Sequence, residues 1–334
     1  MLISFCIPCF NVADYLDHAL ESILAGCRGR EAEVEVILVD DCSTDGRTPQ
    51  AVDAWQARHP ELIRAVHHPC NLGHGGAVNT GLSEAQGEYF KVLDADDWFS
   101  PSCLGQALNL LKAERPDVLI CDYVYEKPSQ QLTRTIGYRK VLPAGRIFNW
   151  SEIKSFKPWQ NILMHSVIYR RELLSRLHLP EHTFYVDNLF VYLPLPKMEK
   201  LYYAPLPLYR YFIGREGQSV QEEVMAGRID QQLLVTRTMM AALDPLDGSL
   251  VPQLGRYLAG YLMMMLVICN VFLIINGRPG LDAERAQLWS ELKASAPATY
   301  RKLHNSLLGR MARLPSHALI KGGYHLAQRV FPFN

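Results

Sequence analysis

The chain has 334 residues, enough for one large domain or for a domain with a helical extension. Hydrophobic residues make up 49% and charged residues 20%, a composition that excludes a disordered or collagen-like protein. Lysine plus arginine and aspartate plus glutamate both number 34, so no overall basic charge would attract nucleic acid. We therefore expect a globular protein with no nucleic-acid partner.

The eight cysteines are scattered along the chain and indicate a reducing cytoplasm rather than a disulfide scaffold. Cys6 and Cys9 have the spacing of a thioredoxin-type motif, but they fall in the first apolar run. We interpret them as small buried residues at a strand end. Met1 leads directly into this run without a preceding basic segment, so no signal peptide is predicted.

Apolar runs and helical patterns alternate through the first 125 residues. In chain order we expect a strand at 2–7, a helix at 13–24, a strand at 34–39, a helix at 48–58, a strand at 63–67, a helix at 76–85, a strand at 89–93, a helix at 101–113 and a strand at 118–121. This alternation predicts an α/β fold with a mostly parallel sheet covered by helices on both faces.

Ligands of such sheets bind beyond the carboxyl ends of the strands. Those ends carry small polar and acidic segments at 8–11, 40–43 and 94–97. Asp94 and Asp96 lie one residue apart after a strand, so both carboxylates can bind one hard divalent cation while phosphate oxygens supply further ligands. An acidic loop can also be merely solvated.

Four segments occur together in a fixed order: Ile-Pro-Cys-Phe-Asn at 7–11, Val-Asp-Asp-Cys-Ser-Thr-Asp-Gly at 39–46, Asn-Leu-Gly at 71–73 with Asn-Thr-Gly at 79–81, and Asp-Ala-Asp at 94–96. In this order and spacing the chain resembles the family 2 inverting glycosyltransferases of the GT-A fold. The resemblance is strong over 1–125 and moderate over 150–220. It implies a Rossmann-like sheet and a nucleotide-sugar donor, with UDP as the expected nucleotide.

The resemblance also implies roles for single residues. Asp41, with Asp40 beside it, would meet the base and ribose, and Asp96 would bind Mn²⁺ or Mg²⁺ together with Asp94. The remaining residues implied at the donor site are Pro8, Phe10, Asn11, Asn71, Gly73 and Arg215.

The chain departs from the family pattern at Val78, where many relatives carry a basic residue. Backbone N–H groups at 73–76 could contact the donor instead, and we interpret His67, His68 and His74 as surface residues.

An inverting transfer needs a general base opposite the leaving phosphate. Asp187 matches the Asp of the family's Glu-Asp-x-x-Phe-like segment, although Val186 stands in place of the Glu. The alternative is an N-cap for the apolar stretch that follows. Residues 159–174 resemble a family helix containing His165, which we interpret as a packed residue of the acceptor wall. Arg210 or Arg215 could reach the pyrophosphate, or Arg215 could pair with a surface glutamate.

We expect a catalytic domain at 1–220, with a donor half at 1–125 and an acceptor half at 126–220, and a helical region at 221–334. Residues 258–275 carry no formal charge, and we favour a buried helix over a membrane span. The segment 300–331 is helical and basic and could contact the inner face of the cell membrane peripherally.

The expected enzyme is a cytoplasmic glycosyltransferase that acts on a glycan or lipid-linked hydroxyl acceptor in cell-surface polysaccharide or glycoconjugate synthesis. A non-catalytic relative and a nucleotide-sugar pyrophosphorylase are the alternatives. A pyrophosphorylase would ordinarily show a glycine-rich basic loop near its N-terminus, where this chain has Pro-Cys-Phe-Asn. A dehydrogenase is disfavoured because no Gly-x-Gly-x-x-Gly follows the first strand. The sugar, the linkage and the oligomeric state stay open.

Overall fold

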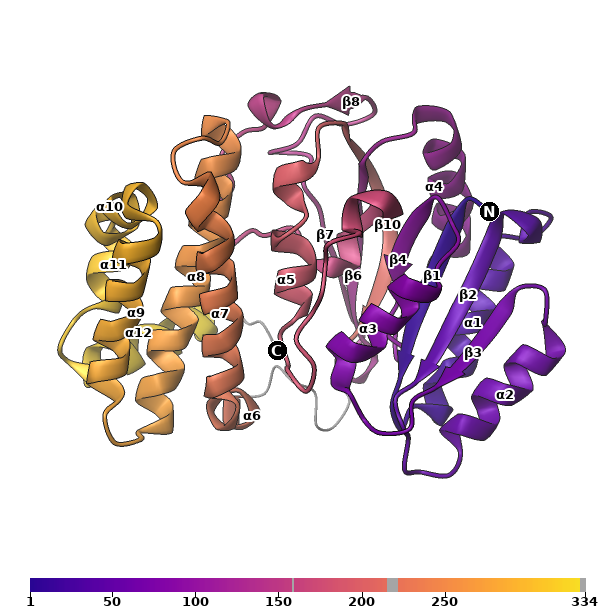
Figure 1. The fold of residues 1–334 in the computed structure, drawn as a ribbon, viewed down its shortest axis with the longest axis horizontal. Coiled ribbons are helices and arrows are strands. Elements are labelled where there is room, and N and C mark those ends of the chain that lie inside the picture. Colours follow the sequence, from indigo (N-terminus) through magenta and orange to yellow (C-terminus); the bar gives the residue numbers. More distant parts are fainter. Residues whose placement is uncertain (158, 215–221, 331–334) are drawn as a thin grey trace. The chain divides into compact units, whose positions relative to one another are not determined.

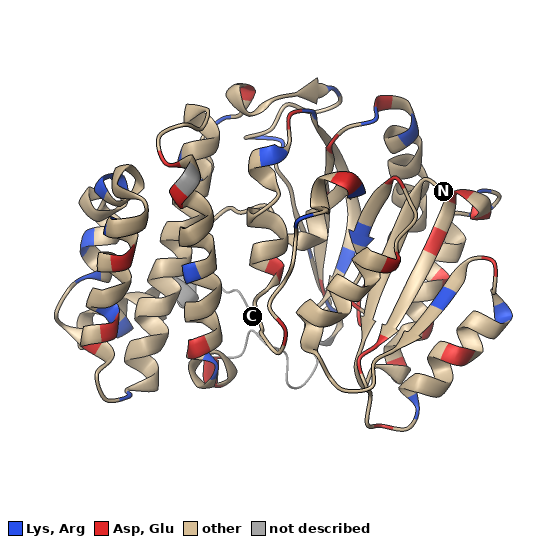
Figure 2. Ribbon diagram, viewed as in Figure 1, with Lys and Arg blue, Asp and Glu red and all other residues tan. Residues whose placement is uncertain are grey.

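The computed structural model describes residues 1–157, 159–214 and 222–330, and the chain divides into two compact units. The first unit comprises Met1–Ile153 and Ile162–Arg215, and the second comprises Lys154–Asn161 and Glu216–Asn334. Figure 1 shows the strands in the first unit and a group of helices in the second. In both units Lys and Arg are interspersed with Asp and Glu (Figure 2).

The strands of the first unit form a single sheet with the order β3-β2-β1-β4-β9-β6-β10-β5, in which β7 also pairs with β6 and β8 with β10. Their bounds are β1 Ile3–Cys9, β2 Val34–Asp40, β3 Ile63–His67, β4 Tyr89–Val92, β5 Trp98–Phe99, β6 Val118–Lys127, β7 Leu132–Ile136, β8 Ile147–Phe148, β9 Val167–Arg170 and β10 Leu201–Phe212. Strands β1 to β4 are parallel to one another, which confirms the expected α/β fold.

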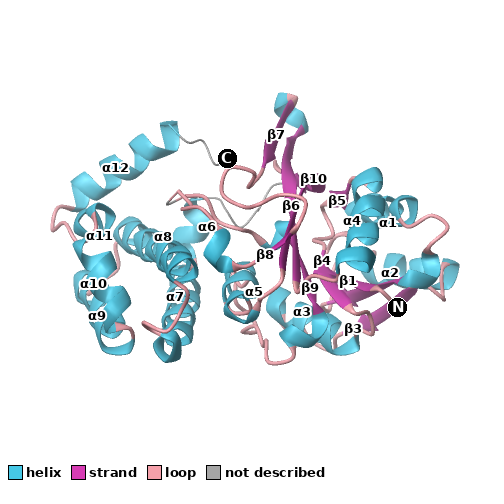
Figure 3. Cartoon of the chain, turned by 90° about the horizontal axis from the view of Figure 1, so that it is seen from above, coloured by secondary structure: helices cyan, strands magenta, loops and turns pink. Residues whose placement is uncertain are grey.

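Helices cover both faces of this sheet (Figure 3). They are α1 Ala13–Gly26, α2 Thr48–Arg58, α3 Gly73–Glu84, α4 Pro101–Glu114 and α5 Asp187–Tyr192. Alternate side chains of β1 point to opposite faces. Ile3, Phe5 and Ile7 join one buried core with residues of α1, α2 and α4, whereas Cys6 points to the other face, where its Sγ lies 3.8 Å from the carbonyl oxygen of Ala77 in α3.

Helix α3 lies unusually close to β1. A Cβ atom at Gly81 would be 2.1 Å from the Sγ of Cys6, so only glycine allows this approach. Both Cys6 and Cys9 are buried strand residues, which confirms the interpretation of the Cys-Ile-Pro-Cys segment. The strand order reverses between β1 and β4, because β2 and β3 extend to one side of β1 while β4 lies on the other. Such a reversal marks the ligand crevice of an open α/β sheet.

One expected element differs. The segment resembling a family helix contains strand β9, which runs antiparallel to both β4 and β6. Its residues Val167, Ile168 and Tyr169 are buried, and a row of apolar and β-branched residues suits a strand enclosed by two neighbours. A short 3₁₀ helix at Met164–Ser166 precedes β9 and contains His165.

The second unit is helical, as expected for the chain beyond residue 221. Its helices are α6 Glu222–Gly227, α7 Ile229–Leu243, α8 Pro252–Asn276, α9 Leu281–Ser295, α10 Pro297–Asn305, α11 Leu307–Ala312 and α12 His317–Val330. Helix α8 is long and apolar enough to cross a membrane, but 72% of its most apolar window is buried inside the protein. That burial supports the interpretation of a core helix.

A polar residue within α8 also has protein partners. The Oδ1 of Asn270 accepts a hydrogen bond from the Nε of Arg285 at 3.1 Å, and Arg285 donates further bonds to the carbonyl oxygens of Ala312 and Leu314. Burying an amide and a guanidinium is acceptable when their donors and acceptors are paired in this way. Asn270 therefore connects α8 to α9 and to the end of α11.

Candidate active site

The loop after β1 is held by Asn11, which adopts a left-handed conformation with φ of 54°. Its Oδ1 accepts hydrogen bonds from the backbone N–H groups of Thr44 at 2.9 Å and Asp45 at 3.1 Å. Its own N–H donates to the Oγ of Ser43. Asn11 thus joins the loops after β1 and β2. Pro8 is half-buried, and Phe10 presents an exposed ring beside it.

Asp40 ends β2, Asp41 follows it, and both are buried. Asp40 accepts hydrogen bonds from the N–H of Ser43 at 3.1 Å and from the imidazole of His67 at 3.0 Å. Asp41 Oδ1 lies 2.7 Å from His68 Nδ1. The two carboxylates therefore already have protein partners. Their contact with the base and ribose stays a prediction, and it would use the lone pairs that these partners leave free.

The carboxylate of Asp41 also stabilises the start of α3. Its Oδ1 accepts from the N–H of Leu72 at 2.7 Å, and its Oδ2 accepts from the N–H of Gly73 at 2.8 Å. Asn71 donates to the Asp41 carbonyl and accepts from Gly73 as well. An anion is favourable at a helix N-terminus, where N–H groups lack partners within the helix. Asn71 and Gly73 therefore support the site structurally, whatever they contribute to the donor.

The glycines of α3 have a packing role, and the donor contact expected for 73–76 stays a prediction beside it. A Cβ at Gly73 would lie 3.0 Å from the backbone N of His182, and one at Gly75 would lie 2.4 Å from the carbonyl oxygen of Pro180. Asn79 donates to and accepts from the backbone of Leu179. Close packing at these glycines thus docks the 179–182 segment, which leads to α5, against α3.

Asp187 is the first residue of α5, and it is not the N-cap, a position taken by Val186 without a side-chain bond. The capping alternative is therefore wrong. Burial raises the pKa of Asp187; the positive charge of His74 opposes this shift, and the negative charge of Asp94 adds to it. A buried carboxylate with a raised pKa is suited to accept a proton near neutral pH.

His74 lies among the acidic residues predicted at the site. Its Nε2 is 2.9 Å from Oδ1 of Asp94. Burial lowers its pKa, but the bond to Asp94 and the charges of Asp94, Asp187 and Asp96 outweigh burial and raise it above the ordinary value. The side chain of His74 is 34% exposed, which agrees with a surface position, but it also bonds Asp94. The interpretation of a surface histidine is wrong for His68, whose side chain is 7% exposed and bonds both Asp41 and Thr80.

The acidic turn after β4 is ordered by Tyr209 of β10. The Tyr209 hydroxyl accepts from the N–H of Asp94 at 3.1 Å and donates to Oδ2 of Asp97 at 2.6 Å. Oδ1 of Asp97 accepts from the N–H of Phe212 at 2.8 Å. Burial and the charges of Asp96 and Asp94 raise the pKa of Asp97 well above its usual range, because a second anion is unfavourable there.

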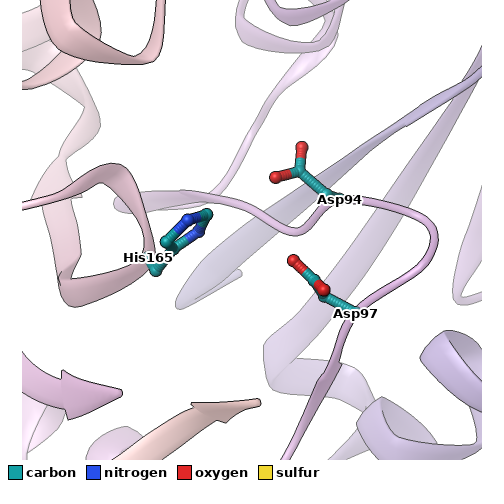
Figure 4. A group of neighbouring side chains, drawn as sticks. All are labelled: Asp94, Asp97 and His165. Atoms are coloured by element: carbon teal, nitrogen blue, oxygen red, sulfur yellow. The ribbon is translucent and has the colours of Figure 1, made fainter. Parts of the chain in front are cut away.

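His165 faces this turn (Figure 4). Its ligand nitrogen and one carboxylate oxygen each of Asp94 and Asp97 lie within 4.8 Å of one another. Burial lowers the pKa of His165 to about 4, so the imidazole is neutral at pH 7. Its Nδ1 is shielded from solvent and has no hydrogen-bond partner among the described residues. Two carboxylates and a neutral imidazole are a suitable donor set for a divalent metal.

The metal ligands predicted from the sequence agree with this group only at Asp94. Asp96 is half-buried and adds its charge to those acting on Asp97 and His74, but it does not belong to the set of three, so its ligation of a metal stays a prediction. Arg210 pairs with Glu126 at 2.7 Å, and its contact with a pyrophosphate stays a prediction. Arg215 lies outside the described residues.

A family model described as "Glycosyl transferase family 2" matches residues 4–175, just over half of the chain. The chain belongs to glycosyl transferase family 2. Among curated relatives in the family, the uncharacterized glycosyltransferase EpsJ of Bacillus subtilis is 28% identical over 183 residues, covering 53% of this chain and 50% of EpsJ. The glycosyltransferase GlyG of Streptococcus pneumoniae is 32% identical over 122 residues, covering 36% and 39%. The chain spans about half or less of the length of these relatives.

Solved structures with the same fold include glycosyltransferases. TarS of S. aureus (residues 1–349), crystallised with UDP-GlcNAc, has a TM-score of 0.72 at 20% identity and covers 98% of this chain and 92% of that one. The mannosyltransferase PcManGT of Pyrobaculum calidifontis, in complex with GDP-Man and Mn²⁺, has a TM-score of 0.55 at 20% identity, with coverage of 99% and 88%. The first unit therefore has the GT-A fold, and family membership identifies the protein as a transferase.

The bonds of Asp41 predict a structural effect of its substitution. Asp41→Asn replaces one of the two carboxylate oxygens at the start of α3 with an NH₂ group, which cannot accept a hydrogen bond. We expect the free energy of unfolding to fall by about 1.5–3 kcal/mol, the range for hydrogen bonds to a charged group. Urea denaturation measures this loss. The exposed Asp14→Asn is the control and should change stability by no more than about 0.5 kcal/mol. Equal stability of the two variants would contradict the structural role.

Proposed function

We propose that the protein is a metal-dependent inverting glycosyltransferase that moves a sugar from a UDP-linked donor to a hydroxyl acceptor. The observation that carries this proposal is the meeting of two acidic groups around His74. The turn at 94–97 lies on one side, bonded to His74 through Asp94, and Asp187 acts on the same imidazole through its charge. The turn at 94–97 follows β4, which lies beside the strand-order reversal where α/β sheets bind ligands.

The acidic turn is the proposed donor side. Asp94, Asp97 and His165 would hold a divalent cation, and Asp96 is near enough to influence their charges. When bound, the cation would stabilise the negative charge that develops on the leaving nucleoside diphosphate. The protein's own part is to hold the turn rigid, which Tyr209 does by bonding Asp94 and Asp97 together. Pro8, Phe10 and Asn11 would line the nucleotide pocket next to this turn.

Asp187 is the proposed general base. It begins α5 at the end of a segment that is docked on the glycines of α3, so its backbone is held firmly. Its raised pKa favours removal of a proton from the acceptor hydroxyl as oxygen attacks the sugar. A single base acting opposite the leaving group produces inversion, because no enzyme nucleophile intervenes.

The donor and acceptor classes are inferred by analogy. TarS was crystallised with UDP-GlcNAc, which supports a uridine nucleotide, while PcManGT was crystallised with GDP-Man and Mn²⁺, which supports the metal. We propose residues 126–220 as the acceptor-binding half and a cell-surface glycan or lipid-linked glycoconjugate as the acceptor.

Calorimetric titration of UDP, GDP and dTDP, with Mn²⁺ or with EDTA, tests the donor site. We expect UDP to bind about tenfold or more tightly with Mn²⁺, and Asp94→Asn to lose this enhancement because it removes a proposed ligand. The exposed variant Asp14→Asn should keep it. If the wild-type protein binds no nucleotide with or without metal, the proposed donor site is wrong.

The pKa shift of Asp187 predicts the pH dependence of transfer. Because the base must be ionised, kcat/KM should fall as the pH drops through a pKa above the ordinary 3.9 of aspartate. His74→Gln removes a positive charge that opposes the raised pKa, so the acid limb should move to still higher pH. Asp94, the other charged group acting on Asp187, is unchanged in this variant. Asp187→Asn should lower kcat about 10²–10⁴-fold. An unmoved acid limb in His74→Gln would contradict this assignment.

We also propose that the second unit contacts the cytoplasmic membrane surface peripherally. The support is a group of exposed large apolar side chains on α11 and α12, namely Leu307 (75% exposed), Leu319 (65%) and Leu326 (63%). The same helices carry the basic residues Arg310 and Lys321, which suit anionic lipid headgroups.

Co-sedimentation with vesicles tests this contact. The protein should bind vesicles containing anionic lipid better than neutral ones, and Leu319→Ser with Leu326→Ser should weaken binding about tenfold or more, because each leucine buries apolar area in the bilayer. Leu258 and Leu262 of α8 are buried, cannot contact lipid, and are unchanged in this variant. Equal sedimentation of wild-type and variant protein would refute the contact.

A further inference from the structure

We infer that His165 is the third protein ligand of the catalytic metal, and that the set Asp94, Asp97 and His165 selects Mn²⁺ over Mg²⁺. This inference rests on the proposed metal dependence and deepens it. The sequence predicts Asp94 and Asp96 as metal ligands and His165 as a packed residue of the acceptor wall. The geometry points to a different set, assembled from two strand ends that are far apart in the sequence.

The first argument is the unpartnered nitrogen of His165. Its Nδ1 is shielded from water and has no hydrogen-bond partner among the described residues. Leaving a buried polar atom unpaired costs about 1–3 kcal/mol, so native proteins rarely do so without a function. Figure 4 shows the imidazole opposite the carboxylates of Asp94 and Asp97, and the three potential ligand atoms lie within 4.8 Å of one another. A cation shared with these carboxylates would bind a ring nitrogen of His165, and coordination through Nδ1 would give that atom its partner.

The second argument is that the imidazole is held in position. The ring stacks on Tyr211, with centroids 4.7 Å apart and planes at 24°, and it contacts the ring of Tyr209 at 4.5 Å. The backbone of the same residue is fixed by Lys91, whose buried Nζ donates to the carbonyl oxygens of Met164 and His165 at 2.8 Å each. A ligand fixed by its neighbours loses little freedom when metal binds.

Tyr209 connects the ligands to one another. Its hydroxyl bonds both Asp94 and Asp97, while its ring packs against His165. The N–H of Phe212 bonds the other oxygen of Asp97. All three proposed ligands are therefore oriented by β10, which gives the metal site a supporting layer of its own. Asp96 has no place in this set, although it lies between two of its members in the sequence.

The third argument concerns the choice of metal. Mg²⁺ strongly prefers oxygen ligands and keeps several of its waters, whereas transition metals accept imidazole nitrogen. A site with one imidazole and two carboxylates therefore favours Mn²⁺ over Mg²⁺. A site with oxygen ligands alone would discriminate less between Mn²⁺ and Mg²⁺.

Electron spin resonance of bound Mn²⁺ tests this inference without measuring catalysis. Mn²⁺ is added to the full chain, alone and with UDP, and electron spin echo modulation detects any directly bonded ¹⁴N. We expect a ¹⁴N coupling in the wild-type protein that disappears in His165→Gln. The variant should bind Mn²⁺ at least about tenfold more weakly, and its preference for Mn²⁺ over Mg²⁺ should shrink. His74→Gln is the matched control, because it removes the other histidine near Asp94 and should retain the coupling.

The outcomes separate this inference from the proposed function. If wild-type Mn²⁺ shows no ¹⁴N coupling, or if His165→Gln keeps the coupling and full affinity, His165 is not a ligand while metal dependence survives. If the wild-type protein binds UDP but no Mn²⁺, the metal-dependent mechanism itself is wrong, and this ligand assignment falls with it. Circular dichroism and UDP binding in EDTA show whether His165→Gln is folded. If that variant is not folded, His74→Gln decides the question, because a coupling that persists without His74 supports His165 and a coupling lost with His74 contradicts it.

Discussion

The geometry of the site depends on the carboxylate of Asp41 at the start of α3. By accepting the N–H groups of Leu72 and Gly73, Asp41 determines where the helix begins. The beginning of the helix determines where His74 meets Asp94 and which glycines face the 179–182 segment. That segment leads to Asp187. One buried anion therefore helps to position both His74, which bonds the acidic turn, and the segment that leads to the proposed base.

The parallel half of the fold could be predicted because its signals are local. Apolar runs, helical spacing and polar strand ends lie in consecutive stretches of sequence, and the bounds of α2 and β3 agree with the expected 48–58 and 63–67. Strand β9 could not be predicted in this way. Its short apolar run is compatible with either a helix or a strand, and only pairing with β4 and β6 decides between them.

The candidate site shows the same division. Asp94 and Asp187 could be predicted because each stands in a recognisable segment. The roles of Asp97, His74 and His165 depend on contacts between distant segments, such as the Tyr209 bonds to the acidic turn. The glycines at 73–76 were visible in the sequence, but their close packing against the 179–182 segment was not predicted. The useful signal for it was the cluster of small residues itself, because backbone can approach backbone only where Cβ atoms are absent.

The path of the chain between the two units limits how this enzyme can be dissected. Residues Lys154–Asn161 leave the first unit, join the helical one and return just before His165. In the helical unit the ring of Phe156 packs 4.7 Å from that of Tyr257, and Asn161 bonds Met264. A protein shortened after residue 215 would keep this loop but lose Tyr257 and Met264, which would leave Phe156 without this ring partner in the segment that precedes His165. The helical unit is thus an integral part of the enzyme and cannot be trimmed as an accessory.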